Sequence, residues 1–201
     1  LSKNITEPKI RKPLLQYLYS IRGVQYEETN QLDAFYKDLH SAYKLNPDTY
    51  SASRLAKYFT VQRENRDAAY YYLNRGEEMF SASNISILQN SVLLRSYGRY
   101  YFKKKDYKKA ISNYEESLAI SEELNKPKDL KDTHKLLFEA YKAVNDESNA
   151  NKNLEQYSKI NDSLSFEHKK IQDTPIKHIL REKEEQDQKK EKNYLYLLII
   201  L

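Results

Sequence analysis

Residues 98–118 read GRYYFKKKDYKKAISNYEESL, and the spacing of small and aromatic residues in this stretch decides the fold. Gly98 lies in the first half, and Ala110 and Tyr114 lie four residues apart in the second half. The polar pair Lys105-Asp106 separates the two halves. This spacing predicts two amphipathic helices joined by a tight turn. The small residues would let the two helices approach closely, and the tyrosine rings would fill the space beside them.

The composition of the whole chain also favours long helices. Its 201 residues include only three Gly and five Pro, which is too few for a turn-rich β protein. The chain has no Cys, which excludes disulfides and thiolate metal sites. The formal net charge is +5, but acidic and basic residues alternate along the chain. A dedicated nucleic-acid-binding domain usually segregates its Lys and Arg onto one patch.

The arrangement around Ala110 recurs along the chain. The equivalent positions of the predicted second helices are Phe35, Ala69, Ala110 and Ala150. Four helical hairpins in sequence, each burying its apolar face against its neighbours, would produce this recurrence. A generic antiparallel helix bundle has similar small-and-aromatic periodicity, and it is the alternative interpretation.

On these residues the chain resembles the tetratricopeptide repeat family, whose unit is a helix–turn–helix of 34 residues. The resemblance covers roughly residues 14–163 and is best at 98–118, with a good match at 23–47. Lys57 and Phe138 depart from the family pattern, because they stand where a small residue is expected. The resemblance implies an all-α fold, a right-handed superhelix of about four helix–turn–helix repeats with a C-terminal helical stalk.

We expect the chain to divide into four segments. Residues 1–13 are predicted to be an N-terminal lead-in, 14–163 the repeat domain, 164–193 a charged helical stalk, and 194–201 the start of a transmembrane helix. Asp173-Thr174-Pro175 is a helix-start signal for the stalk. The middle of the stalk has no apolar residue, so we expect it to be solvated on every side.

The C-terminal residues 193–201 read NYLYLLIIL and contrast with the polar chain before them. Eight apolar residues cannot cross a bilayer, which needs about 20. We interpret them as the beginning of a transmembrane helix that continues beyond Leu201, with Tyr194 and Tyr196 at the membrane interface. The alternative is an apolar strip that packs back on the repeats. By the positive-inside rule, the lysines at 189, 190 and 192 favour a cytoplasmic location for the residues that precede this helix.

The segment 157–200, YSKINDSLSFEHKKIQDTPIKHILREKEEQDQKKEKNYLYLLII, resembles a class of Bacteroidetes membrane regulators. In that class a tetratricopeptide sensor precedes one transmembrane helix and a cytoplasmic output domain. The output domain is most often an AraC-type helix-turn-helix DNA-binding domain and sometimes a histidine kinase. The resemblance implies a periplasmic location for residues 1–193 and an output domain outside this chain. A cytoplasmic location is the alternative.

No catalytic constellation is visible in the sequence. The three glycines are too scattered for a phosphate-binding loop. The four histidines have no partner at metal-binding spacing; they are His40, His134, His168 and His178. We therefore expect no enzymatic activity, no catalytic residue, no cofactor and no metal in this segment.

The candidate binding site is a groove on the concave face, lined by the first helix of each repeat. Arg54, Arg95 and Lys135 occupy equivalent places in three successive units and would form a basic ladder. The full predicted set is Arg54, Tyr58, Arg95, Arg99, Phe102, Lys103, Lys135, Glu139 and Lys142. Such a wall suits an acidic peptide or a C-terminal carboxylate. A solvated basic face is the alternative.

The sequence therefore predicts a ligand- or protein-binding sensor domain of a membrane-anchored transcriptional regulator. Its partner would be a peptide or protein ligand of acidic character, with DNA bound only by the missing output domain. The membrane would be reached through the helix that starts near Tyr194. The sequence is also compatible with a homodimer. The alternatives are a scaffold without an output domain and a soluble peptide-binding regulator.

Overall fold

A computed structural model describes residues 8–82, 87–172, 182–183, 185–186 and 189. These residues are α-helical apart from short turns, and no strand occurs among them. The chain divides into two compact units, Leu1–Tyr157 and Ser158–Leu201. The first unit holds most of the predicted repeat domain 14–163 and all the cavities described below, whereas α8 crosses the boundary between the units.

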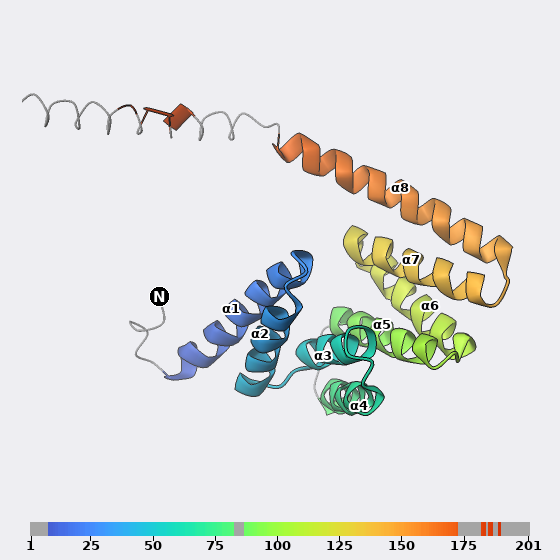
Figure 1. Cartoon of the computed structure of the whole chain (residues 1–201), viewed down its shortest axis with the longest axis horizontal. Helices are drawn as coiled ribbons and strands as arrows, with labels where there is room; N and C mark the ends of the chain where they lie inside the picture. The colour runs from blue at the N-terminus through green and yellow to red at the C-terminus, as the bar shows by residue number, and fades with distance from the viewer. Residues whose placement is uncertain (1–7, 83–86, 173–181, 184, 187–188, 190–201) are drawn as a thin grey trace, which may run out of the picture. The chain divides into compact units, whose positions relative to one another are not determined.

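Eight helices follow one another in the described part of the chain (Figure 1). They are α1 (Pro8–Glu28), α2 (Leu32–Leu45), α3 (Thr49–Val61), α4 (Arg66–Ala82), α5 (Ile87–Lys103), α6 (Tyr107–Glu123), α7 (Pro127–Ala143) and α8 (Glu147–Gln172).

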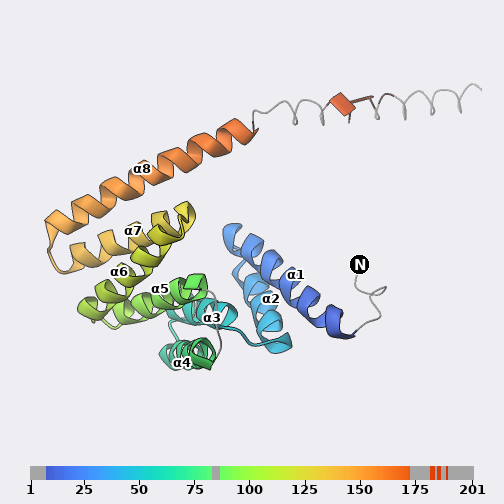
Figure 2. The same ribbon diagram turned by 180° about the vertical axis from the view of Figure 1, so that it is seen from behind.

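The helices pack in chain order. The most extensive packing lies within the pairs α5/α6, α1/α2 and α3/α4, and the reverse view shows these hairpins side by side (Figure 2). The other main partners that the structure describes, such as α3 and α5, lie at most two helices apart along the chain. A closed bundle would instead bring its first and last helices together. The fold is therefore the predicted all-α helical-repeat superhelix.

The predicted repeat phase is confirmed at its most regular position. Phe35, Ala69, Ala110 and Ala150 are each the fourth residue of the second helix in their hairpin. Each of these side chains is at most 2% exposed. The same short distance from the helix start therefore places one buried residue against the first helix in all four hairpins.

The turns inside the four hairpins share one backbone conformation. In all four turns, one residue shortly after the first helix has a positive φ of 49° to 62°. These residues are Asn30, Glu64, Lys105 and Asn145. This left-handed conformation satisfies the last carbonyl groups of the helix. At Lys105, the next amide, that of Asp106, donates to the carbonyl oxygen of Tyr101 at 3.0 Å. The Asp106 carboxylate then caps α6 by accepting from the Lys109 amide at 3.3 Å.

Of the three glycines, Gly98, where α5 meets α6, has the least space for a side chain. The Tyr114 ring lies directly against this glycine and is 1% exposed. A Cβ atom at position 98 would lie 2.5 Å from Cδ1 and 2.9 Å from Cζ of Tyr114, which is inside van der Waals contact. At Gly23, by contrast, an added Cβ would lie 3.8 Å from its nearest neighbour, the Cβ of Asp38.

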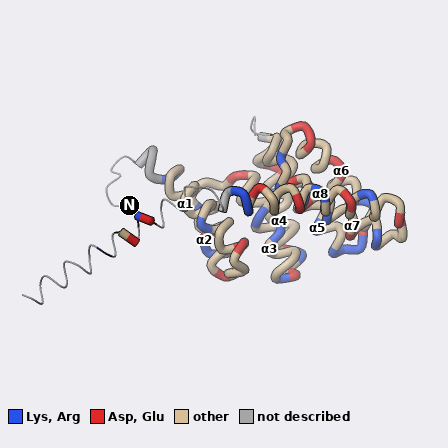
Figure 3. The backbone as a smooth tube through the Cα atoms, turned by 90° about the horizontal axis from the view of Figure 1, so that it is seen from above, with Lys and Arg blue, Asp and Glu red and all other residues tan. Residues whose placement is uncertain are grey.

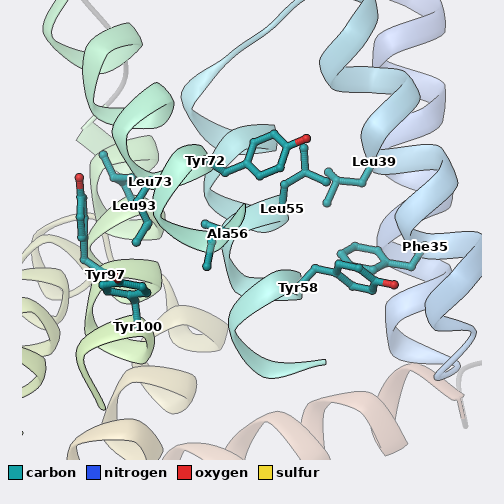
Figure 4. Packing of buried hydrophobic residues seen from close by; sticks show 11 residues of the cluster. Phe35, Leu39, Leu55, Ala56, Tyr58, Tyr72, Leu73, Leu93, Tyr97 and Tyr100 are labelled. Carbon is teal, nitrogen blue, oxygen red and sulfur yellow. The ribbon is translucent and has the colours of Figure 1, made fainter. Parts of the chain in front are cut away.

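The apolar core continues from one hairpin to the next rather than forming a separate core in each. One cluster runs from α2 to α5 and includes Phe35, Leu39, Leu55, Tyr72 and Leu93, as Figure 4 shows. A second cluster joins α6 and α7 through residues such as Tyr114 and Leu137, and Tyr101 of α5 packs against both clusters. Each hairpin thus depends on its neighbours for burial.

Two of the predicted segment boundaries differ from the helix ends. Helix α1 begins at Pro8, inside the predicted lead-in 1–13, because proline fits the first turn of a helix. Helix α8 continues to Gln172, past the predicted boundary at residue 163, because no Gly or Pro interrupts it. The helix start predicted at 173–175 lies outside the described residues.

The predicted membrane segment 194–201 also lies outside the described residues. Within the described part, no helix combines the length and the apolar character that crossing a membrane requires.

The contrast between the two glycines gives a test of the packing. We expect Gly98→Ala to lower the free energy of unfolding by about 1–3 kcal/mol, because the new methyl group overpacks the Tyr114 interface. The matched change Gly23→Ala should raise it by about 0.5–1 kcal/mol, because alanine favours the helix and space is available. Urea denaturation followed by circular dichroism measures both. Equal effects at the two positions would contradict the close contact.

Candidate functional site

A cavity of about 320 Å³ lies among the first helices of the four hairpins, α1, α3, α5 and α7. Charged side chains dominate its wall. The lining residues are Glu27, Tyr50, Arg54, Lys57, Leu88, Val92, Arg95, Ser96, Arg99, Asp129 and Asp132. Figure 3 shows acidic and basic residues interspersed along the chain, and the lining itself contains charges of both signs.

Small residues bring α3 and α5 together beneath the cavity. The Ser96 hydroxyl donates to the carbonyl oxygen of Ser53 at 2.9 Å, and both serines are buried. Arg54 and Arg95 each adjoin one of these serines in the sequence, and both line the cavity. The serine contact therefore fixes the spacing of the two helices that supply most of the cations.

Two cations share one carboxylate at the α1 side of the cavity. The Glu27 carboxylate forms ion pairs with the guanidinium of Arg54 and with Lys57 Nζ, the latter at 2.7 Å. Arg54 also donates to the Tyr50 hydroxyl at 2.7 Å. Burial alone would raise the pKa of the Glu27 carboxyl, but Arg54 and Lys57 together hold it below its usual value. Burial, reinforced by the positive charge of Arg99, lowers the pKa of Lys57.

A second ion pair joins α5 to α7. Arg95 is 6% exposed, and its Nη2 lies 2.6 Å from Oδ1 of Asp129. Its Nη1 also donates to the Asp129 carbonyl oxygen at 3.3 Å. Removing one partner of a buried pair leaves an uncompensated charge and is strongly destabilising. Arg95 therefore holds two hairpins together, and its charge is already committed.

Arg99 is the cation of the cavity whose charge is not committed. Its recorded hydrogen bond within the described residues is a long one, 3.4 Å, from Nη1 to the carbonyl oxygen of Arg95. No carboxylate of the described residues lies within ion-pair distance of it. Burial lowers the pKa of Arg99 below its usual value, and the charge of Arg95 lowers it further, while Tyr114 acts in the opposite direction. A guanidinium has five donors in a fixed fork, so most of those of Arg99 have no acceptor among the described residues.

The charge balance leaves the cavity receptive to an anion. It contains four cations and three carboxylates. Glu27 is shared by two cations, and Asp129 is paired with Arg95. Asp132 is exposed, and its charge partly offsets that of Arg99 from a distance beyond an ion pair. In the described residues no three His, Asp or Glu side chains are placed to hold a metal ion.

Three of the predicted groove residues come together in this cavity, and six do not line it. Arg54, Arg95 and Arg99 do so. The remaining six are Tyr58, Phe102, Lys103, Lys135, Glu139 and Lys142.

Tyr58 was predicted to line the groove, but it lies in the core. It is 3% exposed, and its ring centroid lies 5.9 Å from that of Phe35. Phe102 packs against the Tyr107 ring, with 5.4 Å between centroids. Lys103 is exposed, pairs with Glu64 at 2.9 Å and lines a different, smaller cavity.

The three predicted residues of α7 are exposed. They are Lys135, Glu139 and Lys142. Lys142 lies over the Phe138 ring, 5.8 Å from its centroid. The place that the basic ladder assigned to Lys135 is taken on α7 by Asp129 and Asp132, so the ladder does not extend across the cavity.

Sequence reasoning missed Lys57 and the acidic residues of the cavity. Lys57 was noted only as a departure from the small residue expected at that repeat position. A charged side chain at an otherwise small, buried position was a usable signal, because it needs a buried partner. Glu27 and Asp129 gave no such signal, since their partners lie 27 and 34 residues away.

The ion pairs of Glu27 with Arg54 and Lys57 should make part of the unfolding free energy sensitive to acid. Because the pKa of Glu27 is lower in the folded chain than its usual 4.5, the unfolded chain binds the proton more readily. Its contribution is complete above about pH 5.5 and is lost as the pH falls through 4.5 and below. Glu27→Gln should therefore flatten this part of the curve of unfolding free energy against pH, measured by urea denaturation. Glu28→Gln, an exposed neighbour, is the control and should leave the curve unchanged.

Comparison with known proteins supports the fold only. No family model matches the chain, and no curated protein matches it. Among solved structures it is similar to BtubC (BKLC) from P. vanneervenii, with a TM-score of 0.58 and 21% identity. The match covers 80% of this chain and 68% of that one. At this identity the similarity shows a shared helical architecture.

Proposed function

We propose that this chain is a non-enzymatic binding module that captures a carboxylate-bearing segment of a peptide or protein in the cavity at Arg99. The observation that carries the proposal is the guanidinium of Arg99, which lines the cavity without a carboxylate partner among the described residues. The other cations of the cavity already have partners: Arg54 and Lys57 share Glu27, and Arg95 pairs with Asp129.

The chemistry of the cavity favours a carboxylate. A guanidinium presents parallel N–H groups that match the two oxygens of a carboxylate, and such paired bonds are among the strong ones. The apolar residues Leu88 and Val92 exclude water from part of the wall, which strengthens an ion pair. A volume of about 320 Å³ admits a side chain or a chain end rather than a folded surface.

A half-buried charge without an ion-pair partner is costly to a folded protein, and this cost also supports a binding role. Desolvation disfavours the charged form of Arg99, as the lowered pKa indicates. A ligand carboxylate would supply the charge that the protein does not.

The place of this module in a larger receptor is also part of the proposal. The resemblance of residues 157–200 to membrane-anchored regulators supports a periplasmic sensor whose DNA-binding output lies outside this chain. In such a receptor, peptide binding at the repeats would be the input signal. The helical-repeat architecture suits this role, because each hairpin contacts only its neighbours and small changes add along the array.

Arg99→Gln tests the proposed function. We expect its affinity for an acetylated, amidated Ser-Gly-Ser-Gly-Asp-Glu peptide to fall by about 10- to 100-fold, since a charge-assisted hydrogen bond contributes about 1.5–3 kcal/mol. Isothermal titration calorimetry measures the affinity. The melting temperature should stay the same or rise, because an uncompensated charge is removed.

Lys135→Gln is the matched control, since it removes one positive charge from an exposed position outside the cavity. It should leave the affinity nearly unchanged. Asp132→Asn should strengthen binding, because it removes one of the two carboxylates, Asp132 and Glu27, whose charges partly offset that of Arg99. If Arg99→Gln and Lys135→Gln weaken binding equally, the effect is one of net charge and the proposed site is wrong.

A further inference from the structure

A separate cavity of about 510 Å³ lies among α4, α5 and α6. Its side of α5 differs from the side that lines the cavity at Arg99. Tyr97 and Tyr101 line it and come two residues after Arg95 and Arg99, which places them about 200° further around the helix. The two cavities therefore lie on opposite faces of α5, and no described residue lines both of them.

Three tyrosine rings contribute flat surfaces to the wall of this cavity. Tyr97 and Tyr101 stack with their ring centroids 6.2 Å apart and 17° between their planes. Tyr70 of α4 is 47% exposed, and its ring stacks on that of Tyr100 at 5.7 Å. These contacts fix the orientation of the rings. An aromatic ring is negative on its face, so it attracts C–H groups that carry a slight positive charge.

Three asparagine side chains add polar groups to the same wall. They are Asn74 of α4, Asn90 of α5 and Asn113 of α6. Nδ2 of Asn113 donates to the carbonyl oxygen of Lys109 at 2.8 Å. The side chains of Asn74 and Asn90 are half-buried and make no hydrogen bond within the described residues. An amide both donates and accepts, as a hydroxyl group does, so the wall suits a ligand with several hydroxyls.

Glu77 supplies the carboxylate of the wall. Its Oε2 accepts a hydrogen bond from the Tyr97 hydroxyl at 2.5 Å. Burial raises the pKa of Tyr97, and the hydrogen bond to Glu77 raises it further, so the hydroxyl stays protonated. A carboxylate has about four acceptor sites, and Glu77 therefore retains capacity for neighbouring hydroxyl groups of a ligand.

The charges of this wall cancel. Glu77 and Lys109 are the charged residues among the described ones that line it. The ammonium of Lys109 lies 5.2 Å from the centroid of the Tyr101 ring and 3.4 Å from Oδ2 of Asp106. Lys109 opposes a ligand cation, and Glu77 opposes a ligand anion. In contrast to the cavity at Arg99, this one therefore favours a neutral ligand.

We propose that the cavity among α4, α5 and α6 binds a neutral mono- or disaccharide. A pyranose ring has C–H groups on its faces and hydroxyl groups around its edge. Its face packs on Tyr70 and Tyr101, and its hydroxyls pair with the amides of Asn74 and Asn90 and with the carboxylate of Glu77. The volume lies within the range of small-molecule sites. The inference is independent of the proposed function, because the two cavities share no described residue.

A panel of neutral disaccharides tests the inference on the chain of residues 1–201. The probes are maltose, cellobiose, lactose, mannobiose and chitobiose, which differ in linkage and in the orientation of their hydroxyls. We expect at least one to bind with a dissociation constant of about 1 mM or tighter, measured by saturation-transfer NMR and calorimetry. If none of them binds at about 10 mM, the inference is overturned.

Two variants locate the bound sugar. Tyr70→Ser should weaken it by about tenfold, because an aromatic face is lost. Asn74→Leu should weaken it by about two- to tenfold, because the amide is replaced by an apolar group of similar size. Tyr71→Ser is the matched control, since Tyr71 is 55% exposed on the same helix and lies outside the cavity. Melting temperatures establish that all three variants are folded.

The other outcomes are also decisive. If Tyr70→Ser and Tyr71→Ser weaken the sugar equally, it binds elsewhere and the inference is wrong. If choline binds in a manner that depends on Tyr70 while no sugar binds, the rings form a cation site and the inference is again wrong. Arg99→Gln should leave sugar binding unchanged. Loss of peptide binding and loss of sugar binding are therefore separate results, and each refutes only its own proposal.

Discussion

The contact between Gly98 and the Tyr114 ring constrains the geometry on which the rest of the first unit depends. Because no side chain separates α5 from α6 at this point, the two helices lie close, and the tyrosine fills the space that a larger residue would occupy. The same interface continues through a buried contact between the hydroxyls of Ser91 and Ser117 at 2.9 Å. Helix α5 is thereby held against α6 on one face, while Ser96 joins it to α3 on another. The faces that remain present Arg95 and Arg99 to the cavity, so the position of these cations follows from helix packing rather than from a loop.

The cavity combines groups that stabilise the fold with one that does not. Arg95 and Asp129 form a buried pair between successive hairpins, and Glu27 serves two cations of α3. These pairs connect the first helices across the interfaces between repeats, whose energies contribute to the stability of a solenoid. Arg99 lies beside them, and no carboxylate in the described part of the chain lies within ion-pair distance of it. The proposed site would therefore be preorganised, because the paired charges hold the walls and Arg99 is the proposed contact for the ligand.

The fold could be predicted from the sequence because the spacing of small and aromatic residues that determines it lies within one hairpin. The fourth residue of each second helix is buried in the same way, so a spacing that can be read within one hairpin repeats in the others. Equivalence between repeats also placed Arg54 and Arg95 correctly on one wall. Equivalence between repeats did not predict the positions of side chains whose neighbours differ. Tyr58 lies in the core because its ring packs on Phe35 and Tyr36, and Lys135 does not line the cavity. The acids that decide which cation is free lie on other helices, and no single-sequence pattern gives those pairings.

The position of the site connects binding to the mechanics of a repeat array. Its walls come from the first helices of all four hairpins, so a ligand seated there touches every interface that sets the curvature of the first unit. In such an array stability is a sum of local interface terms, each of which is small. A ligand that bridges several interfaces stabilises one arrangement of them over the others by its differential affinity. In the proposed function, an acidic ligand would pair with Arg99 and so relieve the cost of desolvating its charge, which the lowered pKa indicates. The same charge would then both weaken the module without a ligand and give the proposed ligand its influence on the array.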